Sequence, residues 1–160
     1  MIILSKKVNA GLIVGGVVVV VVATVVLLIL TKFQPSVTLY LGDGVFDAQI
    51  AKTTAEREKG LGGIKNLDAN QSLILAFPSD DKWKIGMKDM KVPIDIIWLD
   101  KDKKVIHIVK NASPENPTNI TFTPKYSARY VIEVPAGTVD SKTIKTGWAA
   151  VFDINTEEVK

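Results

Sequence analysis

The sequence contains no cysteine and only one histidine, His107, among its 160 residues. Without cysteine the chain can form no disulfide, no thiolate nucleophile and no cysteine-ligated zinc or iron–sulfur site. A single histidine excludes a histidine-rich metal site. No Gly-x-Ser-x-Gly nucleophile elbow and no Gly-x-x-x-x-Gly-Lys phosphate loop occurs in the chain. We therefore expect no metal and no cofactor.

An excess of charge of one sign is also missing from most of the chain. The net charge is +3, from 20 basic and 17 acidic residues. Lys6 and Lys7 precede a long apolar run, so 18 basic residues face the same 17 acidic residues in the remainder. This near-neutral balance, with no basic run, argues against nucleic acid as a partner.

The apolar run extends from Ala10 to Leu30 and contains no charged residue. As a helix it would be roughly 30 Å long, which matches the hydrocarbon core of a bilayer. The apolar core of a signal peptide has only about 7–15 residues, so we predict an uncleaved transmembrane anchor over residues 10–31. Two lysines precede the run and only Lys32 closely follows it, and the more basic flank of a membrane span stays in the cytoplasm. We therefore predict that residues 1–9 are cytoplasmic, that residues 32–36 form a short juncture, and that residues 37–160 lie outside the cell membrane.

The part after the anchor is predicted to be one compact, mostly β domain with one short helix. Thr53 and Glu56 have the spacing of a capping box, which predicts a helix over 54–59. A sandwich or barrel-like arrangement is expected because short apolar or alternating segments recur between turn signals. The predicted strands cover residues 37–41, 45–51, 72–77, 94–100, 104–110, 128–134 and 148–154.

Asp95 is the first candidate for a functional side chain, because it begins a predicted strand with two apolar faces. A carboxylate in such a place must be hydrogen-bonded or paired. The simpler interpretation is structural: Asp95 accepts backbone amides and anchors the loop 87–92. Lys88 and Arg129 are alternative partners, and a catalytic or ligand-binding acid is the functional alternative.

Arg129 and Glu133 are expected to share one face of the strand over 128–134. Arg129 could form an ion pair with Asp95 or with Glu133, because an arginine fork holds a carboxylate in two parallel hydrogen bonds. Alternatively, Arg129 and Lys88 could present a small anion-binding patch. The candidate ligand-binding set is therefore Lys88, Asp95, Arg129 and Glu133, and no metal site is predicted.

Several segments together resemble the prokaryotic family called domain of unknown function 192, over about residues 45–154. The resemblance is carried, in order, by AKTTAEREKGLGG, SLILAFP, MKDMKVPIDIIWLDKDKKV, ARYVIEVPAG and IKTGWAAVF. It implies a compact, mostly β fold that is usually exported or membrane-anchored, and it implies no activity, substrate or cofactor. The chain departs from the family pattern at two places. Gly86 stands where relatives tend to carry an aromatic, with Trp83 three residues earlier, and Gly62-Gly63-Ile64 lacks an arginine.

Three functions are compatible with these observations. We favour a membrane-anchored extracytoplasmic module that binds an unidentified ligand or protein of the cell envelope without catalysis. The second is an envelope hydrolase or isomerase that uses Asp95 or Glu133 as acid or base, with Lys88 and Arg129 as electrostatic stabilisers. The third is a purely structural envelope component. The enzyme hypothesis requires at least two of these four groups to line an open pocket with one carboxylate unpaired.

Overall fold

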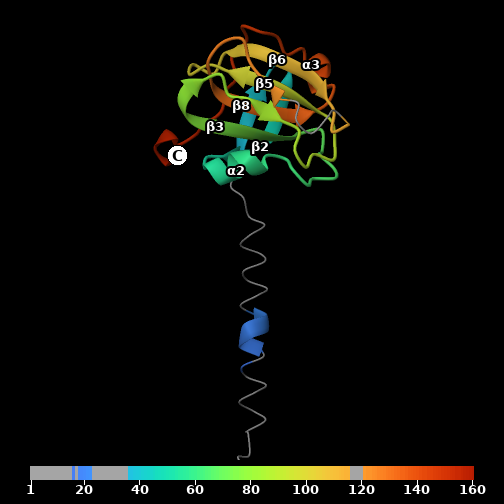
Figure 1. Ribbon diagram of the computed structural model, residues 1–160, viewed down its shortest axis with the longest axis vertical. Helices are drawn as coiled ribbons and strands as arrows, with labels where there is room; N and C mark the ends of the chain where they lie inside the picture. The colour runs from blue at the N-terminus through green and yellow to red at the C-terminus, as the bar shows by residue number, and fades with distance from the viewer. Residues whose placement is uncertain (1–15, 17, 23–35, 116–120) are drawn as a thin grey trace, which may run out of the picture. The chain divides into compact units, whose positions relative to one another are not determined.

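The computed structural model describes residues 16, 18–22, 36–115 and 121–160 (Figure 1). The chain divides into two units, Met1–Gln34 and Pro35–Lys160. In the first unit the described residues are helical, and the rest of the anchor predicted over 10–31 lies outside the described residues. Among the residues that the structure describes, no helix is both long enough and apolar enough to cross a membrane.

The second unit is built on a six-stranded sheet with the strand order β1-β2-β3-β8-β5-β6. Strands β2 and β3 are parallel, and the other neighbouring pairs are antiparallel. Two short strands, β4 and β7, pair separately. The elements are β1 (Ser36–Leu41), β2 (Gly44–Ala51), α2 (Thr54–Lys59), β3 (Gln71–Asp81), β4 (Ile85–Gly86), β5 (Ile94–Leu99), β6 (Val105–Ala112), β7 (Thr121–Phe122), β8 (Ala128–Pro135), α3 (Thr138–Ser141) and η1 (Thr156–Glu158).

Helix α2 lies in the crossover between the parallel strands β2 and β3, and it confirms the helix predicted over 54–59. The Thr53 hydroxyl accepts the Glu56 amide at 3.3 Å, and the Glu56 carboxylate accepts the Thr53 amide at 2.9 Å. This reciprocal capping box satisfies amides that have no partner within the helix. Gly60, with φ 49°, ends the helix, because glycine adopts positive φ without steric cost.

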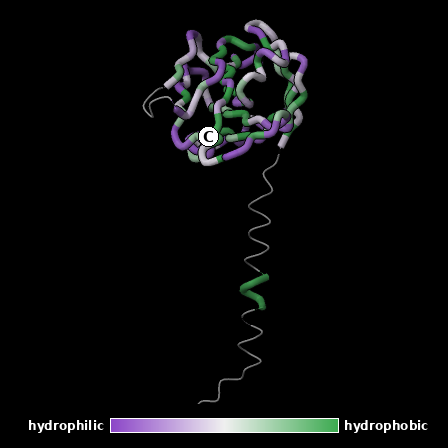
Figure 2. Tube along the Cα trace, turned by 90° about the vertical axis from the view of Figure 1, so that its right-hand side faces the viewer, coloured by the Kyte–Doolittle hydropathy of each residue, from purple (hydrophilic) through white to green (hydrophobic). Residues whose placement is uncertain are grey.

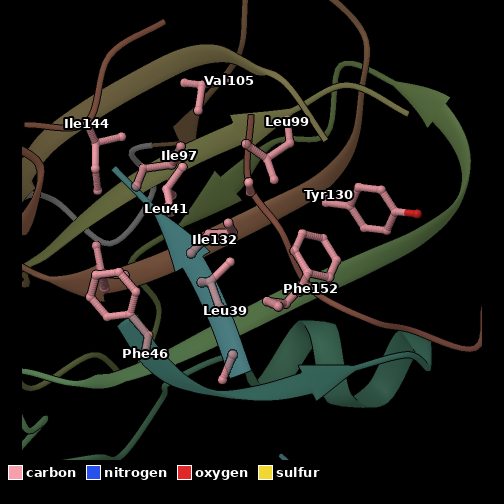
Figure 3. Packing of buried hydrophobic residues seen from close by; sticks show 14 of the residues in the cluster. Leu39, Leu41, Phe46, Ile97, Leu99, Val105, Tyr130, Ile132, Ile144 and Phe152 are labelled. Atoms are coloured by element: carbon pink, nitrogen blue, oxygen red, sulfur yellow. The ribbon is translucent and has the colours of Figure 1, made fainter. Parts of the chain in front are cut away.

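Each face of the sheet packs against its own hydrophobic cluster. Because side chains alternate along a strand, Ile97 and Leu99 of β5 join one cluster and Ile96 and Trp98 join the other. Figure 3 shows the first cluster, where Tyr130 packs edge-on against Phe152. Figure 2 shows hydrophobic segments running through the inside of this unit, with hydrophilic ones along its outer turns. Strand β5, which lies between β8 and β6, is consequently buried over its whole length.

The mostly β class is confirmed, whereas the predicted sandwich or barrel is not. The described residues contain one main sheet and no closed barrel. The strand predicted over 148–154 is wrong: this segment makes only isolated bridges, Val151 to Tyr40 and Ala149 to Lys104. It therefore passes from the start of β6, at one edge of the sheet, to β1 at the other edge. Ala150 and Phe152, on the same segment, belong to the first cluster.

Candidate functional site

The four candidate residues do not gather in one place. Strand pairing aligns Asp95 with Val134 and Ile96 with Glu133. Neighbouring positions of a strand point to opposite faces, so Asp95 and Glu133 lie on opposite sides of the sheet. Lys88 and Glu133 line one pocket, and neither Asp95 nor Arg129 lines it.

Asp95 is a fully buried structural acid with both oxygens occupied. Its Oδ1 accepts the Asn111 amide at 2.8 Å, and its Oδ2 accepts the Val139 amide at 2.8 Å. The expected amide acceptance is confirmed, but the expected segment is wrong, because these amides belong to the end of β6 and to α3 rather than to the loop 87–92. Asn111 has φ 53°, and the hydrogen bond to Asp95 helps to hold this uncommon conformation.

Arg129 pairs with neither Asp95 nor Glu133, contrary to the predicted ion pairs. Its Nε donates to Asp80 Oδ1 at 2.6 Å, and both side chains are partly exposed. Asp80 lies where the register between β3 and β8 shifts, between Ala76 and Asp81. Arg129 thus fastens the irregular end of β3 to β8.

The pocket that contains Glu133 has a volume of about 460 Å³. This size lies within the usual range of about 300–1,000 Å³ for small-molecule sites. Its walls come from α2 and the following turn, the end of β3, the segment from 83 to 90, and β8. The apolar lining consists of Leu61, Phe77, Pro78, Trp83, Ile85 and Met90, and the charged lining of Arg57, Glu58, Lys59, Lys84, Lys88, Glu133 and Lys160.

Glu133 is the unusual group in this pocket, because its side chain is only 4% exposed and its Oε2 has no hydrogen-bond partner among the described residues. Burial raises the pKa of this carboxyl to about 7, and a hydrogen bond from the Leu61 amide offsets part of the rise. The turn after α2 passes close above the carboxyl: a Cβ on Gly60 would lie 3.6 Å from Oε2.

Arg57 lines the pocket, but its guanidinium is already hydrogen-bonded within the domain. Its guanidinium donates to the carbonyls of Lys52 at 2.6 Å, Ala76 at 2.9 Å and Lys160 at 2.6 Å, and to the Thr54 hydroxyl at 3.1 Å. These bonds tie α2 to β3 and to the C-terminal residue, which lies near α2 in Figure 1. By contrast, Lys84 and Lys88 are exposed and form no ion pair within the described part of the chain.

Trp83 supplies the aromatic wall. Its ring stacks on Phe77 with centroids 4.2 Å apart and an angle of 11° between the planes. Its indole nitrogen donates to the Ser79 carbonyl at 3.1 Å, and its own carbonyl accepts the Trp98 indole at 2.9 Å. These contacts fix the ring in place. Gly86 lines the same pocket, so Trp83 provides an aromatic group beside the position where the resemblance leads one to expect one.

The sequence interpretation missed Trp83 and Lys84 as pocket residues. A usable signal was present, because Trp83 stands between Lys82 and Lys84 and outside any predicted strand. Tryptophan is enriched among the residues that contribute most to binding at interfaces.

A comparison with protein families settles the classification of the chain. The model of DUF192, described as an uncharacterized ACR, matches residues 37–152. The chain belongs to the DUF192 family. The resemblance over 45–154 is thereby confirmed, and the match begins with β1.

Individual DUF192 relatives and similar structures agree with this classification. The chain is 32% identical over 114 residues to a UPF0127 protein of Thermococcus gammatolerans, which covers 70% of each chain. It is 31% identical over 111 residues to one of Thermococcus sibiricus, with 68% of each chain covered. A protein of unknown function from Novosphingobium aromaticivorans has a similar structure, with TM-score 0.66, 26% identity, and 72% of this chain and 83% of that chain covered. A Sinorhizobium meliloti protein shares the fold, with TM-score 0.66, 21% identity, and coverage of 73% and 92%.

Proposed function

We propose that this DUF192 protein is a membrane-anchored, extracytoplasmic domain that binds a small ligand in the Glu133 pocket. The anchor and the orientation rest on the uncharged run from Ala10 to Leu30 and on the lysines that precede it. The binding role rests on the pocket.

The observation that carries the binding role is the buried Oε2 of Glu133, which has no partner among the described residues. An unsatisfied buried acceptor costs about 1–3 kcal/mol. Uncompensated polar groups of this kind are concentrated at functional sites. A ligand that donates a hydrogen bond to Oε2 would remove this cost. Of the four sequence candidates, Lys88 and Glu133 therefore remain in the proposed site.

Catalysis by Glu133 is the second candidate function. A pKa of about 7 suits a carboxyl that both accepts and donates a proton near neutral pH. Lys88 lines the same pocket and could stabilise negative charge that develops on a substrate. The requirement for two candidate groups in one pocket with an unpaired carboxylate is met, so the enzyme hypothesis gains support relative to the sequence alone.

A thermal-shift screen of the fragment 33–160 tests the binding role. Both hydrophobic clusters consist of residues between 37 and 159, so this fragment retains its whole core. The panel contains sugars, metal ions, amino acids and short peptides. We expect at least one class to stabilise the wild-type fragment and to lose this effect in Glu133→Gln. The exposed Glu115 gives the control Glu115→Gln, which should respond like the wild type. Stabilisation that survives Glu133→Gln would contradict the proposed site.

Protease treatment of intact spheroplasts tests the topology. We expect an added protease to remove the domain 37–160 from the full chain while a cytoplasmic marker protein stays intact. Protection of the domain until the membrane is dissolved would contradict the proposed orientation.

A further inference from the structure

We infer that the ligand of the Glu133 pocket is a small zwitterion, whose ammonium group pairs with Glu133 and whose anionic group meets Lys84 and Lys88. This inference rests on the proposed function and adds the chemical class of the ligand. It is drawn from the charged residues that line the pocket and from their burial.

The surroundings of Glu133 favour a ligand group with a positive charge. Glu133 is buried beneath the turn at Gly60 and Leu61, and no cation pairs with it among the described residues. A hydroxyl donor would satisfy Oε2 but would leave the ionised form of the carboxyl, which forms as the pH rises past about 7, without a compensating charge. An ammonium group satisfies the hydrogen bond and the charge together, and charge-assisted bonds of this kind are about twice as strong as neutral ones.

The exposed lysines of the pocket favour a ligand group with a negative charge. The lining contains five cationic residues, Arg57, Lys59, Lys84, Lys88 and Lys160, against Glu58 and Glu133. Arg57 is occupied by its own hydrogen bonds, whereas Lys84 and Lys88 are exposed and form no ion pair within the described residues. A ligand with only positive charge would be repelled on approach. A ligand with only negative charge would meet the Glu133 carboxylate at the end of the pocket.

The pocket also has an apolar lining. Trp83, Ile85 and Met90 line the pocket together with the charged groups, and Trp83 is fixed by its stacking on Phe77. A ligand that contacts both Glu133 and Lys88 could pack its carbon skeleton against these apolar side chains. Amino acids and amino-carboxylates with a short methylene spacer have this sequence of groups.

A series of amino-carboxylates of increasing length measures the separation of the two charges. Glycine, β-alanine, γ-aminobutyrate and ε-aminocaproate are titrated into the full chain in detergent by isothermal calorimetry. We expect one length to bind best. Butylamine and butyrate, which carry one charge each, should both bind more weakly than γ-aminobutyrate. Equal affinity for butyrate and γ-aminobutyrate would overturn the inference.

Variants assign the two charges of the ligand. Glu133→Gln should weaken binding of the best amino-carboxylate about 30-fold or more, because it removes a buried charge partner. Lys84→Gln and Lys88→Gln should each weaken it about two- to fivefold, an effect that salt diminishes, because exposed pairs contribute little. Lys101 is exposed, pairs with Asp102 and lies outside the pocket, so Lys101→Gln is the matched control. A loss in Lys101→Gln equal to that in Lys88→Gln would contradict the assignment.

The pH dependence gives a readout that a merely structural role of Glu133 would not produce. An ammonium ligand favours the ionised carboxylate, so binding at neutral pH should release a proton, and affinity should fall as the pH drops below about 7. Calorimetry in buffers of different ionisation enthalpy measures this release. The charged groups that share the pocket with Glu133 are Arg57, Glu58, Lys59, Lys84, Lys88 and Lys160. Proton uptake on binding would overturn the inference.

The failure of this inference can be told apart from failure of the proposed function. Glycerate and gluconate offer hydroxyl donors and one negative charge. If they bind in a manner that depends on Glu133 while every amino-carboxylate fails, the site remains and the zwitterion is wrong. If no compound of the broad panel shows Glu133-dependent stabilisation, the binding role itself is contradicted.

Discussion

Replacement of Asp95 by asparagine tests whether this buried acid is structural. The carboxylate uses one oxygen for the Asn111 amide and the other for the Val139 amide. An asparagine side chain has one oxygen and one NH2 group. In Asp95→Asn, one of the two backbone amides would therefore face another donor, and the side-chain hydrogen bond from β5 to Asn111 of β6 or to Val139 of α3 would be lost.

The expected loss of stability can be worked out from these two bonds. A buried amide without an acceptor costs about 1–3 kcal/mol. The bond that remains changes from a charge-assisted to a neutral one, which costs about another 1 kcal/mol. We expect Asp95→Asn to lower the free energy of unfolding by about 3 kcal/mol. For a domain of this size that corresponds to a decrease in Tm of roughly 10 °C.

Asp100 provides a matched control for Asp95→Asn. Its Oδ1 alone accepts two amides, those of Asp102 at 2.9 Å and Lys104 at 2.8 Å. An asparagine oxygen can accept both, so Asp100→Asn should cost less than about 1 kcal/mol. Urea unfolding of the fragment 33–160, followed by circular dichroism, measures both variants. If Asp95→Asn costs no more than Asp100→Asn, the structural role of Asp95 is refuted.

Three further perturbations probe stability elsewhere. Burial raises the pKa of Glu133 from 4.5 to about 7, so the free energy of unfolding of the wild type should fall by roughly 3 kcal/mol as the pH rises through this interval. Glu133→Gln should remove this loss. In parallel urea titrations the variant should be more stable than the wild type at pH 8 but not at pH 4. Thr53→Ala should cost about 1 kcal/mol by breaking the capping box, whereas Thr53→Ser should cost little in the same assay. Gly42→Ala would place its Cβ 2.2 Å from the Lys142 carbonyl oxygen, whereas a Cβ at Gly63 would have nothing within 4 Å. Both glycines have positive φ, so the backbone strain is shared and Gly63→Ala is the control. Gly42→Ala should be less stable than Gly63→Ala by more than about 2 kcal/mol, measured as a lower Tm.

Local patterns predicted the elements of this fold well, because their causes are local. The capping residues Thr53 and Glu56 and the glycine at 60 specify α2 without reference to the remainder of the chain. The segment 148–154 has the composition of a strand, but whether a strand forms depends on a partner with matching register. Here the sheet edges are reached by single bridges at Ala149 and Val151. Composition therefore could not distinguish this segment from a strand.

The sequence predicted on which face of the sheet Glu133 lies, but it did not predict which residues line the pocket. Alternation along β8 correctly placed Glu133 on the face of Val131, because Glu133 pairs with Ile96, a member of the same cluster as Val131. Arg129 is nevertheless four positions from Glu133, which is about 13 Å along a strand, and it reaches Asp80 instead. Lys88 enters the pocket through a loop whose path depends on tertiary packing. Such proximity cannot be deduced from the spacing of residues in one strand.

The two buried acids of this domain differ in whether both carboxylate oxygens have a hydrogen-bond partner. Asp95 has one amide donor for each of its two oxygens. Glu133 has an equally buried carboxyl, but its Oε2 lacks a partner among the described residues and lies in a pocket with exposed lysines. If Glu133 served stability alone, a glutamine or an apolar residue would serve better at neutral pH, because the buried carboxylate is destabilising there. A buried acid at this position is what the proposed binding role requires.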